Sequence, residues 1–352
     1  MSATRTVRRA PAAAESPVIG PDRLRPAGLL ALATVALLVV CVASLAFGAR
    51  PIGWATLFEA WFDYDPANGD HAVVVSRIPR TVVGLLVGAA LGLAGAAMQG
   101  VARNPLADPG ILGVNAGAAL AVVVAMFAFG ITSLSGYIWF AFLGAGLAAV
   151  LVYAVASLGR EGATPVKLAL AGAALSAGLS SLMNGILVSS QETLDGFRFW
   201  QIGSLSGRTL DVVIPVVPFL AVGAAITLAT GRILNGLALG DDVARGLGQR
   251  VGWGRALTAV GVVILCGAAT ALAGPIMFVG LVIPHIARAL VGTDYRWILP
   301  LSMALAPVLL ITADVVGRLV LPPGEVQAGV MTAVVGGPVF IWLVRRHKAA
   351  AL

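Results

Sequence analysis

Long stretches without a charged residue constrain the fold of this chain more than any other feature. Eight such tracts of at least 17 residues occur: 26–49, 81–102, 109–159, 168–191, 212–231, 256–287, 297–313 and 326–344. Each is long enough to cross a bilayer core of about 30 Å as an α-helix. Two of them exceed one crossing, and each contains a turn signal, at 130–136 and at Gly274-Pro275. The sequence therefore predicts an all-α polytopic membrane protein with ten transmembrane helices.

Composition excludes several other classes of protein. Hydrophobic residues make up 59% of the chain and charged residues only 11%, whereas soluble domains carry roughly 25% charged residues. The net charge of +7 comes from basic residues scattered between apolar tracts, which argues against a nucleic-acid-binding surface. Cys41 and Cys266 both fall inside apolar tracts, so we expect packing roles and no disulfide framework.

The basic residues also predict the orientation in the membrane. Ten crossings place both termini on one side, and cytoplasmic termini put 17 of the 23 Lys and Arg residues inside, as the positive-inside rule requires. We expect residues 1–25 to form a disordered basic cytoplasmic tail, 26–344 a single transmembrane domain, and 345–352 a cytoplasmic C-terminal tail. The apolar run after residue 25 is longer than a signal-peptide core, which favours an uncleaved first helix.

One segment of the chain repeats. Residues 86–105 align with 265–284, and nine of the twenty aligned pairs are identical. Composition bias is the alternative explanation in a chain so rich in Ala, Gly and Leu. In the expected topology the two copies run in opposite directions across the bilayer. The match therefore predicts an inverted repeat, the plan of many transporters.

The chain has no recognisable catalytic or metal-binding motif. A phosphate-binding Walker A loop needs Gly before its Lys, and neither Lys167 nor Lys348 follows a Gly. His71, His285 and His347 lack a metal-ligand spacing. We expect no metal and no cofactor on this chain. If ATP drives its activity, a separate chain hydrolyses it.

Four short stretches carry a more specific signal: 77–80 (RIPR), 95–113 (GAAMQGVARNPLADPGILG), 239–248 (LGDDVARGLG) and 274–288 (GPIMFVGLVIPHIAR). They resemble the permease subunits of ABC importers for iron-siderophores, haem and cobalamin, the FecCD family that includes the vitamin B12 permease. The resemblance extends over about 75–345. It departs from the family pattern at 325–329, where EVQAG stands in place of the usual ELPVG.

The resemblance implies an assembly. The family has a ten-helix subunit of the type II importer kind, normally as a homodimer or paired with a homologous permease. Two cytoplasmic ATPase subunits carry ATP and Mg²⁺, and an external substrate-binding protein delivers the cargo. Membrane lipid would be the remaining partner, and no nucleic acid is expected.

Arginines at the outer ends of two spans are candidates for docking that binding protein. Arg77 and Arg80 flank Pro79, which we place in the first turn of the second span. Both cations should then face water or headgroups, and simple snorkelling is the alternative role. In the family, outer basic residues pair with acidic residues of the binding protein. That resemblance implies docking by Arg77 and Arg80, with Arg318 as a weaker candidate.

The segment 232–255 is the longest polar stretch between internal spans. Asp241 or Asp242 should begin a capped short helix. Val243, Ala244 and Leu247 should give this helix an apolar stripe, with 243 and 247 one turn apart. In the family such a helix contacts the ATPase, and a merely interfacial amphipathic helix is the alternative. The predicted coupling residues are Leu239, Gly240, Asp241, Asp242, Val243, Ala244, Arg245, Leu247 and Gly248.

Polar residues within the spans are candidates for the transport pathway, because polar groups in hydrocarbon are costly. Asp314 is expected to pair with Arg318, one helical turn later. The Asn-Pro pair of the second stretch should break a helix near the inner gate, and small residues in the fifth span suit either a dimer seam or a pore wall. The pathway or gate candidates are Gln99, Asn104, Pro105, Asn115, Ser176 and Asn184.

We therefore expect the permease subunit of an ATP-driven importer in the bacterial inner membrane, moving an iron-siderophore complex into the cytoplasm. Haem and cobalamin permeases share these motifs and are alternatives. A secondary transporter driven by an ion gradient is less favoured, because Asp314 is its sole candidate for an ion site. An integral-membrane enzyme is the remaining alternative.

Overall fold

The computed structural model describes residues 26–158, 164–322 and 324–350. Within these ranges all regular structure is helical, so the predicted all-α class is confirmed. The predicted tail 1–25 lies outside the described residues, as do the last two residues of the predicted tail 345–352. Helix α15 continues to Ala350, and the rest of that tail is therefore helical.

Ten apolar helices account for the ten predicted spans. They are α1 (Pro26–Ala46), α3 (Gly69–Ala102), α4 (Val114–Phe129), α5 (Leu134–Ala156), α6 (Pro165–Ser189), α9 (Val217–Ala229), α12 (Val251–Ala273), α13 (Val279–Val291), α14 (Tyr295–Val320) and α15 (Ala328–Ala350). Among the described residues, seven segments are long and apolar enough to cross a membrane, and α4, α13 and α15 supply three shorter apolar stretches. Both expected breaks are present, because Gly130 ends α4 and Gly274 ends α12 with φ of 64° and 76°.

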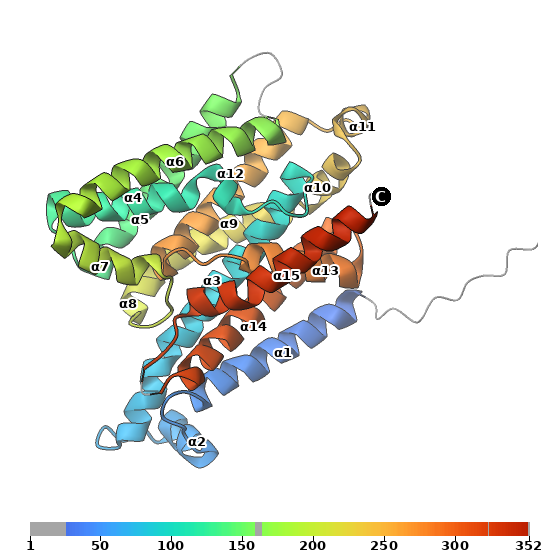
Figure 1. Ribbon diagram of the computed structural model, residues 1–352. Helices are drawn as coiled ribbons and strands as arrows, with labels where there is room; N and C mark the ends of the chain where they lie inside the picture. Colours follow the sequence, from blue (N-terminus) through green and yellow to red (C-terminus); the bar gives the residue numbers. More distant parts are fainter. Residues whose placement is uncertain (1–25, 159–163, 323, 351–352) are drawn as a thin grey trace, which may run out of the picture.

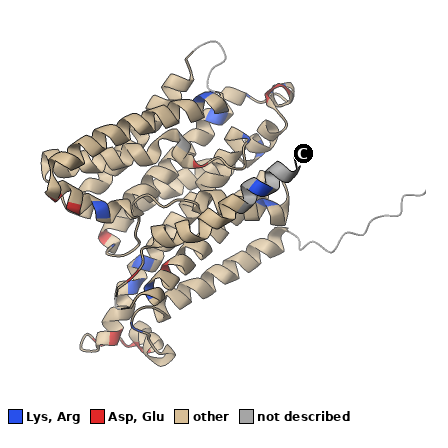
Figure 2. Ribbon diagram, in the orientation of Figure 1, with Lys and Arg blue, Asp and Glu red and all other residues tan. Residues whose placement is uncertain are grey.

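Short elements lie at the two ends of this bundle. They are α2 (Trp54–Phe62), α7 (Gln191–Gln201), α8 (Leu210–Val213), α10 (Gly231–Ala238), α11 (Asp241–Gly246) and the 3₁₀ turns η1 (Pro109–Leu112) and η2 (Ile214–Val216). In Figure 1, α10 and α11 lie at the same end as the start of α1 and the end of α15, whereas α2, α7 and α8 lie at the opposite end. Most charged residues also lie towards these two ends (Figure 2). We call the α11 end inner and the α2 end outer, following the expected topology.

The second span begins earlier than predicted. Helix α3 starts at Gly69, where the Asn68 side chain caps it by accepting a hydrogen bond from the Asp70 amide at 3.0 Å. Pro79 therefore lies inside the helix and not in its first turn. The expectation was wrong because it took charged residues as helix boundaries, whereas the cations beside Pro79 are paired with internal groups, as described below.

In its α12 part the second repeat copy runs antiparallel to the first, as predicted, whereas its residues from Val279 lie in α13, which returns towards the inner end. Arg103 follows the last residue of α3, and Arg255 lies near the start of α12. Both guanidinium groups contact the Asp241 carboxylate, at 3.4 and 2.8 Å. The end of α3 and the beginning of α12 therefore meet at the inner end of the bundle, and the helices run in opposite directions from there.

Helix α3 is the most buried span. The most apolar window of α3 is 78% buried inside the protein, against 17% for α1 and for α6. Its glycines allow close helix contact: a Cβ atom on Gly95 would collide with the backbone carbonyl of Gly280 on α13. The aligned Gly274 has a different role, because its positive φ ends α12. Helices α3 and α13 thus pack backbone to backbone.

This contact predicts a position-specific effect of adding one methyl group. Gly95→Ala should destabilise the protein by about 1–3 kcal/mol through overpacking against Gly280. Gly146→Ala on α5 is the matched control, because a Cβ atom there meets nothing within 4 Å. Thermal unfolding in detergent should show a lower midpoint for the first variant only. Equal midpoints for the two variants would contradict the close packing.

Candidate functional site

A buried carboxylate organises the outer end. Asp314 on α14 is 1% exposed and accepts hydrogen bonds from Arg80 Nε at 2.9 Å and Arg80 Nη2 at 2.8 Å. Arg318 Nη2 lies 3.2 Å from the same carboxylate, which confirms the predicted pairing one turn apart. Arg80 Nη1 also donates to Glu325 at 2.7 Å. We call these four residues the outer ion cluster.

Arg77 secures the neighbouring backbone. Its guanidinium donates to the carbonyl oxygens of Leu45 and Ala46 at 2.8 and 3.0 Å and to that of Arg50 at 2.6 Å. Arg318 likewise donates to the Ser44 carbonyl at 3.0 Å. Two arginines from α3 and α14 therefore hold the end of α1, whose last carbonyls have no partners within their own helix.

The expectation that the docking candidates face water is wrong. Arg77 and Arg318 are only 7% and 4% exposed, and the Arg80 side chain is 11% exposed. Asp314 neutralises Arg80 and Arg318, and carbonyl oxygens accept hydrogen bonds from Arg77, which makes the burial of these side chains tolerable. Docking of a binding protein by these residues stays a prediction, and it would require access to charges that already have internal partners.

The same arginines line a cavity at the outer end. This cavity of about 570 Å³ is bordered by Arg50, Arg77, Arg80, Arg208 and Arg318, together with Glu325. Arg208 Nε donates to the Leu272 carbonyl at 2.6 Å, and burial lowers the pKa of its guanidinium. The cavity therefore presents an excess of positive charge and suits anionic groups.

Neutralising Asp314 should be costly. Asp314→Asn leaves Arg80 and Arg318 without their shared buried carboxylate, and breaking a buried pair costs about 3–5 kcal/mol. Asp242→Asn is the control, because the Asp242 side chain is 98% exposed. We expect a clearly lower unfolding temperature in detergent for the first variant and no change for the second. Equal stability of both would show that the outer ion cluster is not structural.

A second shared carboxylate lies at the inner end. Besides Arg103 and Arg255, Asp241 has Arg245 Nη2 at 4.0 Å. The predicted side-chain cap on α11 is absent, because Gly240 with φ 102° occupies the N-cap position. Asp242 points away and pairs with Arg245 at 2.8 Å. Asp241 therefore tethers α11 to the ends of α3 and α12.

The apolar surface of α11 differs from the predicted stripe. Val243 and Leu247 are 50% and 65% exposed, and Leu239 just before the helix is 62% exposed, whereas Ala244 is fully buried. Ala244 therefore does not belong to the exposed stripe, because it faces the core on which α11 packs. Gly248, with φ 81°, follows the stripe. Three exposed aliphatic side chains at a polar end of the protein suit a partner surface.

Three pathway candidates gather at the inner end. Gln99, Asn104 and Pro105 line a cavity of about 330 Å³ together with His285 and Arg288. Arg288 Nη2 donates to Gln99 Oε1 at 3.0 Å, which bridges α13 and α3. The polar lining and its place beside α10 fit an inner gate.

The other candidates are separate from this cavity. Asn115 Oδ1 accepts a hydrogen bond from Thr270 at 3.1 Å, which joins α4 to α12. Ser176 and Asn184 lie on α6, where Ser176 is half-buried and Asn184 exposed. A Cβ atom on Gly178 of the same helix would meet nothing within 4 Å. The exposed surface of α6, which includes Asn184 and Gly178, is open to a second copy or to a pathway.

One inner contact has a signal that the sequence interpretation missed. Asp294 caps α14 by accepting from the Arg296 amide at 2.9 Å, and it also accepts from Asn235 on α10 at 2.6 Å. Burial would raise the pKa of Asp294, but these hydrogen bonds and the Arg296 charge outweigh it and lower the pKa. An Asp directly before an apolar run is a recognisable N-cap signal.

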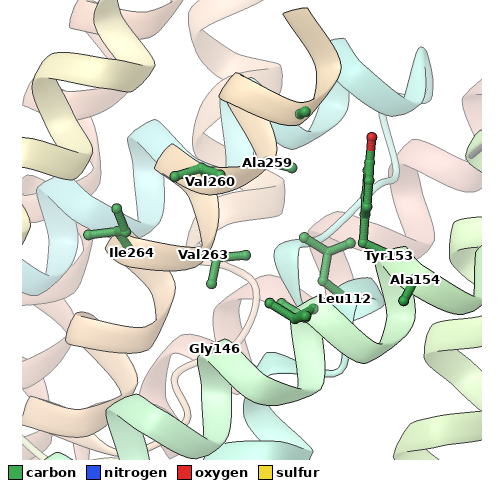
Figure 3. Close-up of a pocket in the computed structure, with 11 residues that line it drawn as sticks. Leu112, Gly146, Tyr153, Ala154, Ala259, Val260, Val263 and Ile264 are labelled. Atoms are coloured by element: carbon green, nitrogen blue, oxygen red, sulfur yellow. The ribbon is translucent and has the colours of Figure 1, made fainter. Parts of the chain in front are cut away.

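A further cavity, of about 450 Å³, is apolar. It lies between α5 and α12 and is lined by residues such as Leu112, Gly146, Val260 and Ile264 (Figure 3). Tyr153 carries the one labelled polar tip in this view. Such a lining cannot orient a charged cargo, so this cavity is not the candidate pathway.

Comparison with known proteins decides the family. The model of the FecCD transport family matches residues 36–346. The chain belongs to the FecCD transport family. This result confirms the resemblance read from the four sequence stretches and identifies a multi-pass membrane permease.

Named relatives and a solved structure agree with this assignment. The chain is 44% identical to the probable siderophore transport system permease protein YfiZ of Bacillus subtilis, over 90% of this chain and 95% of the relative. It is also 44% identical to the ferric enterobactin transport system permease protein FepD of Escherichia coli, over 91% and 94%. A structure described as an inward-facing putative metal-chelate type ABC transporter is similar, with a TM-score of 0.78, 30% identity and coverage of 90% and 99%.

Proposed function

We propose that this chain is the permease subunit of an ATP-binding-cassette importer that moves a ferric siderophore complex into the cytoplasm. The observation that carries the proposal is the end-to-end match, at 44% identity, to two permeases named for siderophore or ferric enterobactin transport. Haem and cobalamin remain alternative cargoes, because permeases for them share these sequence motifs. The pairing of Asp314 with two arginines argues against the ion-gradient alternative, because an ion site needs an unneutralised carboxylate.

The proposed assembly contains two permease chains, as a homodimer or with a homologous permease, in the bacterial inner membrane. Two ATPase subunits, carrying ATP and Mg²⁺, would contact the inner end, and an external binding protein would dock at the outer end. Both termini would be cytoplasmic. Two observations support this orientation. It places 17 of the 23 Lys and Arg residues in the cytoplasm, and the start of α1 and the end of α15 lie at the same end of the bundle (Figure 1).

The contacts at the inner end suggest how ATPase movement enters the membrane. The ATPase would press on Leu239, Val243 and Leu247. Asp241 passes this movement to α3 through Arg103 and to α12 through Arg255. Because α3 packs tightly on α13, the helices that line the inner cavity around Gln99 would shift as rigid bodies.

At the outer end, docking would involve an exchange of carboxylates. Glu325 is the most exposed acidic member of the outer ion cluster, with its side chain 28% exposed. An acidic residue of the binding protein could replace Glu325 on Arg80 without exposing Asp314. The positive cavity would then receive an anionic chelate as the binding protein releases it.

The coupling role of α11 predicts loss of ATPase association. Leu247→Asp should prevent the ATPase subunits from co-purifying in mild detergent, because it places a charge in the proposed apolar contact. Leu321→Asp is the matched control: Leu321 is 59% exposed, close to the 65% of Leu247, but lies at the outer end. Retention of the ATPase by the first variant, or its loss from both, would contradict this contact.

The cargo is tested by uptake in a strain that lacks this chain. Labelled ferric siderophore should no longer accumulate, whereas labelled haem and labelled cobalamin should enter at the parental rate. Reintroducing the chain should restore siderophore uptake. Unchanged siderophore uptake in the deletion strain would contradict the proposed cargo. If only haem uptake or only cobalamin uptake were lost, that compound would be the cargo instead.

A further inference from the structure

Helix α2 carries an unusual set of exposed aromatic side chains. Trp54, Phe58, Trp61 and Phe62 are 54%, 63%, 63% and 81% exposed. The helix has only nine residues and lies at the outer end between α1 and α3. Neither the outer cavity nor the outer ion cluster uses these four side chains.

The sequence of α2 divides its surface into three sectors. At about 100° per residue, the four aromatic side chains occupy an arc of about 100°. Thr56, Leu57 and Ala60 occupy a second arc. Ala60 is buried in a small cluster against α3, with Leu57 packed on it. Glu59 lies in the remaining sector, and its side chain is 61% exposed. One sector thus faces protein, one is charged, and one is aromatic.

The aromatic sector continues a surface that faces lipid. Helix α1 is mostly exposed, with aliphatic side chains such as Leu38 and Val42 on its surface. Phe47, one residue beyond α1, is 44% exposed. Its ring meets Trp54 edge to face, with the centroids 6.3 Å apart. The aromatic side chains of α2 therefore extend the lipid-facing side of α1 to the outer boundary of the membrane.

We propose that α2 is an interfacial helix whose aromatic face lies in the headgroup region of the leaflet at the outer end of the bundle. Trp is enriched at this depth, because its ring is apolar and its N–H can reach water or headgroups. A helix lying in the interface should contact protein on one side, lipid below and water above, which is the sector pattern of α2.

The charges near α2 specify the kind of lipid surface. Residues 50–71 contain Glu59, Asp63, Asp65 and Asp70 but only one basic residue, Arg50. The segment therefore has no attraction for anionic headgroups, and the apolar aromatic area must supply the binding. Insertion of the helix should therefore not require anionic lipid.

The anchor would fix the depth of the outer cavity. Arg77 holds the last carbonyl oxygens of α1, those of Leu45 and Ala46, and the Arg50 carbonyl in the connection to α2. The Arg50 side chain pairs with Asp70 on α3 at 2.6 Å. Arg50 and Arg77 also line the outer cavity. Insertion of α2 would therefore hold the mouth of the cavity at a constant height above the bilayer.

Spin labels on adjacent residues test this proposal in the full-length protein. In a background with Cys41→Ala and Cys266→Ala, Phe58→Cys and Glu59→Cys are labelled separately, and the protein is reconstituted in nanodiscs of zwitterionic lipid. The label at 58 should collide readily with oxygen and poorly with a water-soluble nickel chelate. The label at 59 should show the reverse, and replacing part of the lipid with an anionic one should not increase the protection at 58.

Four results would overturn the proposal. The first is equal access of the nickel chelate to the labels at 58 and 59, and the second is protection of the label at 58 only after an external binding protein is added. The third is dipolar broadening between the labels of two copies, and the fourth is protection at 58 that requires anionic lipid. The result does not depend on cargo or ATP, so it is independent of the proposed function.

A second measurement avoids replacing the cysteines. Intrinsic tryptophan fluorescence is quenched by lipids brominated near the glycerol backbone or near the methyl end of the chain. The double variant Trp54→Phe, Trp61→Phe should lose mainly the quenching by the shallow bromines. If the ratio of quenching by shallow bromines to quenching by deep bromines were unchanged in this variant, the interfacial position of α2 would be contradicted.

Discussion

A charge that is shielded from water is stable only when a partner compensates it, and this constraint organises both ends of the protein. At the outer end, Arg80 and Arg318 share Asp314. At the inner end, Arg103 and Arg255 share Asp241. Helix α3 connects the two sites, because Arg80 lies on it and Arg103 directly follows it. At 1.5 Å per residue these arginines are about 34 Å apart, close to the thickness of the bilayer core.

The helix that joins the two sites is also the one that packs most closely. Cβ atoms on Gly88, Gly92 and Gly95 would each collide with backbone or side-chain atoms of α14 or α13. Small residues at such contacts let backbones approach and leave little freedom for independent sliding. A displacement of Asp241 at the inner end would therefore move α3 together with α13 and α14. The same movement would reach the outer cavity, which Arg80 and Arg318 border.

The ten helices were predictable because charged residues are costly in hydrocarbon, so that membrane spans appear in the sequence as long tracts without charge. The same rule misplaced the start of α3, since Arg77 and Arg80 are charged yet buried through contacts with distant segments. Asp314 and Arg318 were found as a pair one turn apart, but Arg80 lies 234 positions from Asp314. The burial of Ala244 likewise depends on how α11 docks. Local spacing predicts local pairs, and tertiary contacts determine the rest.

The central claim is that Asp241 transmits movement of the inner surface to the membrane helices. The most direct measurement compares Asp241→Asn with Asp242→Asn, adjacent carboxylates whose side chains are 23% and 98% exposed. ATP hydrolysis and cargo transport would be measured together in proteoliposomes with the ATPase subunits and binding protein. We expect Asp241→Asn to keep hydrolysis while transport per ATP falls several-fold, and Asp242→Asn to change neither. Normal transport per ATP in Asp241→Asn would contradict the account.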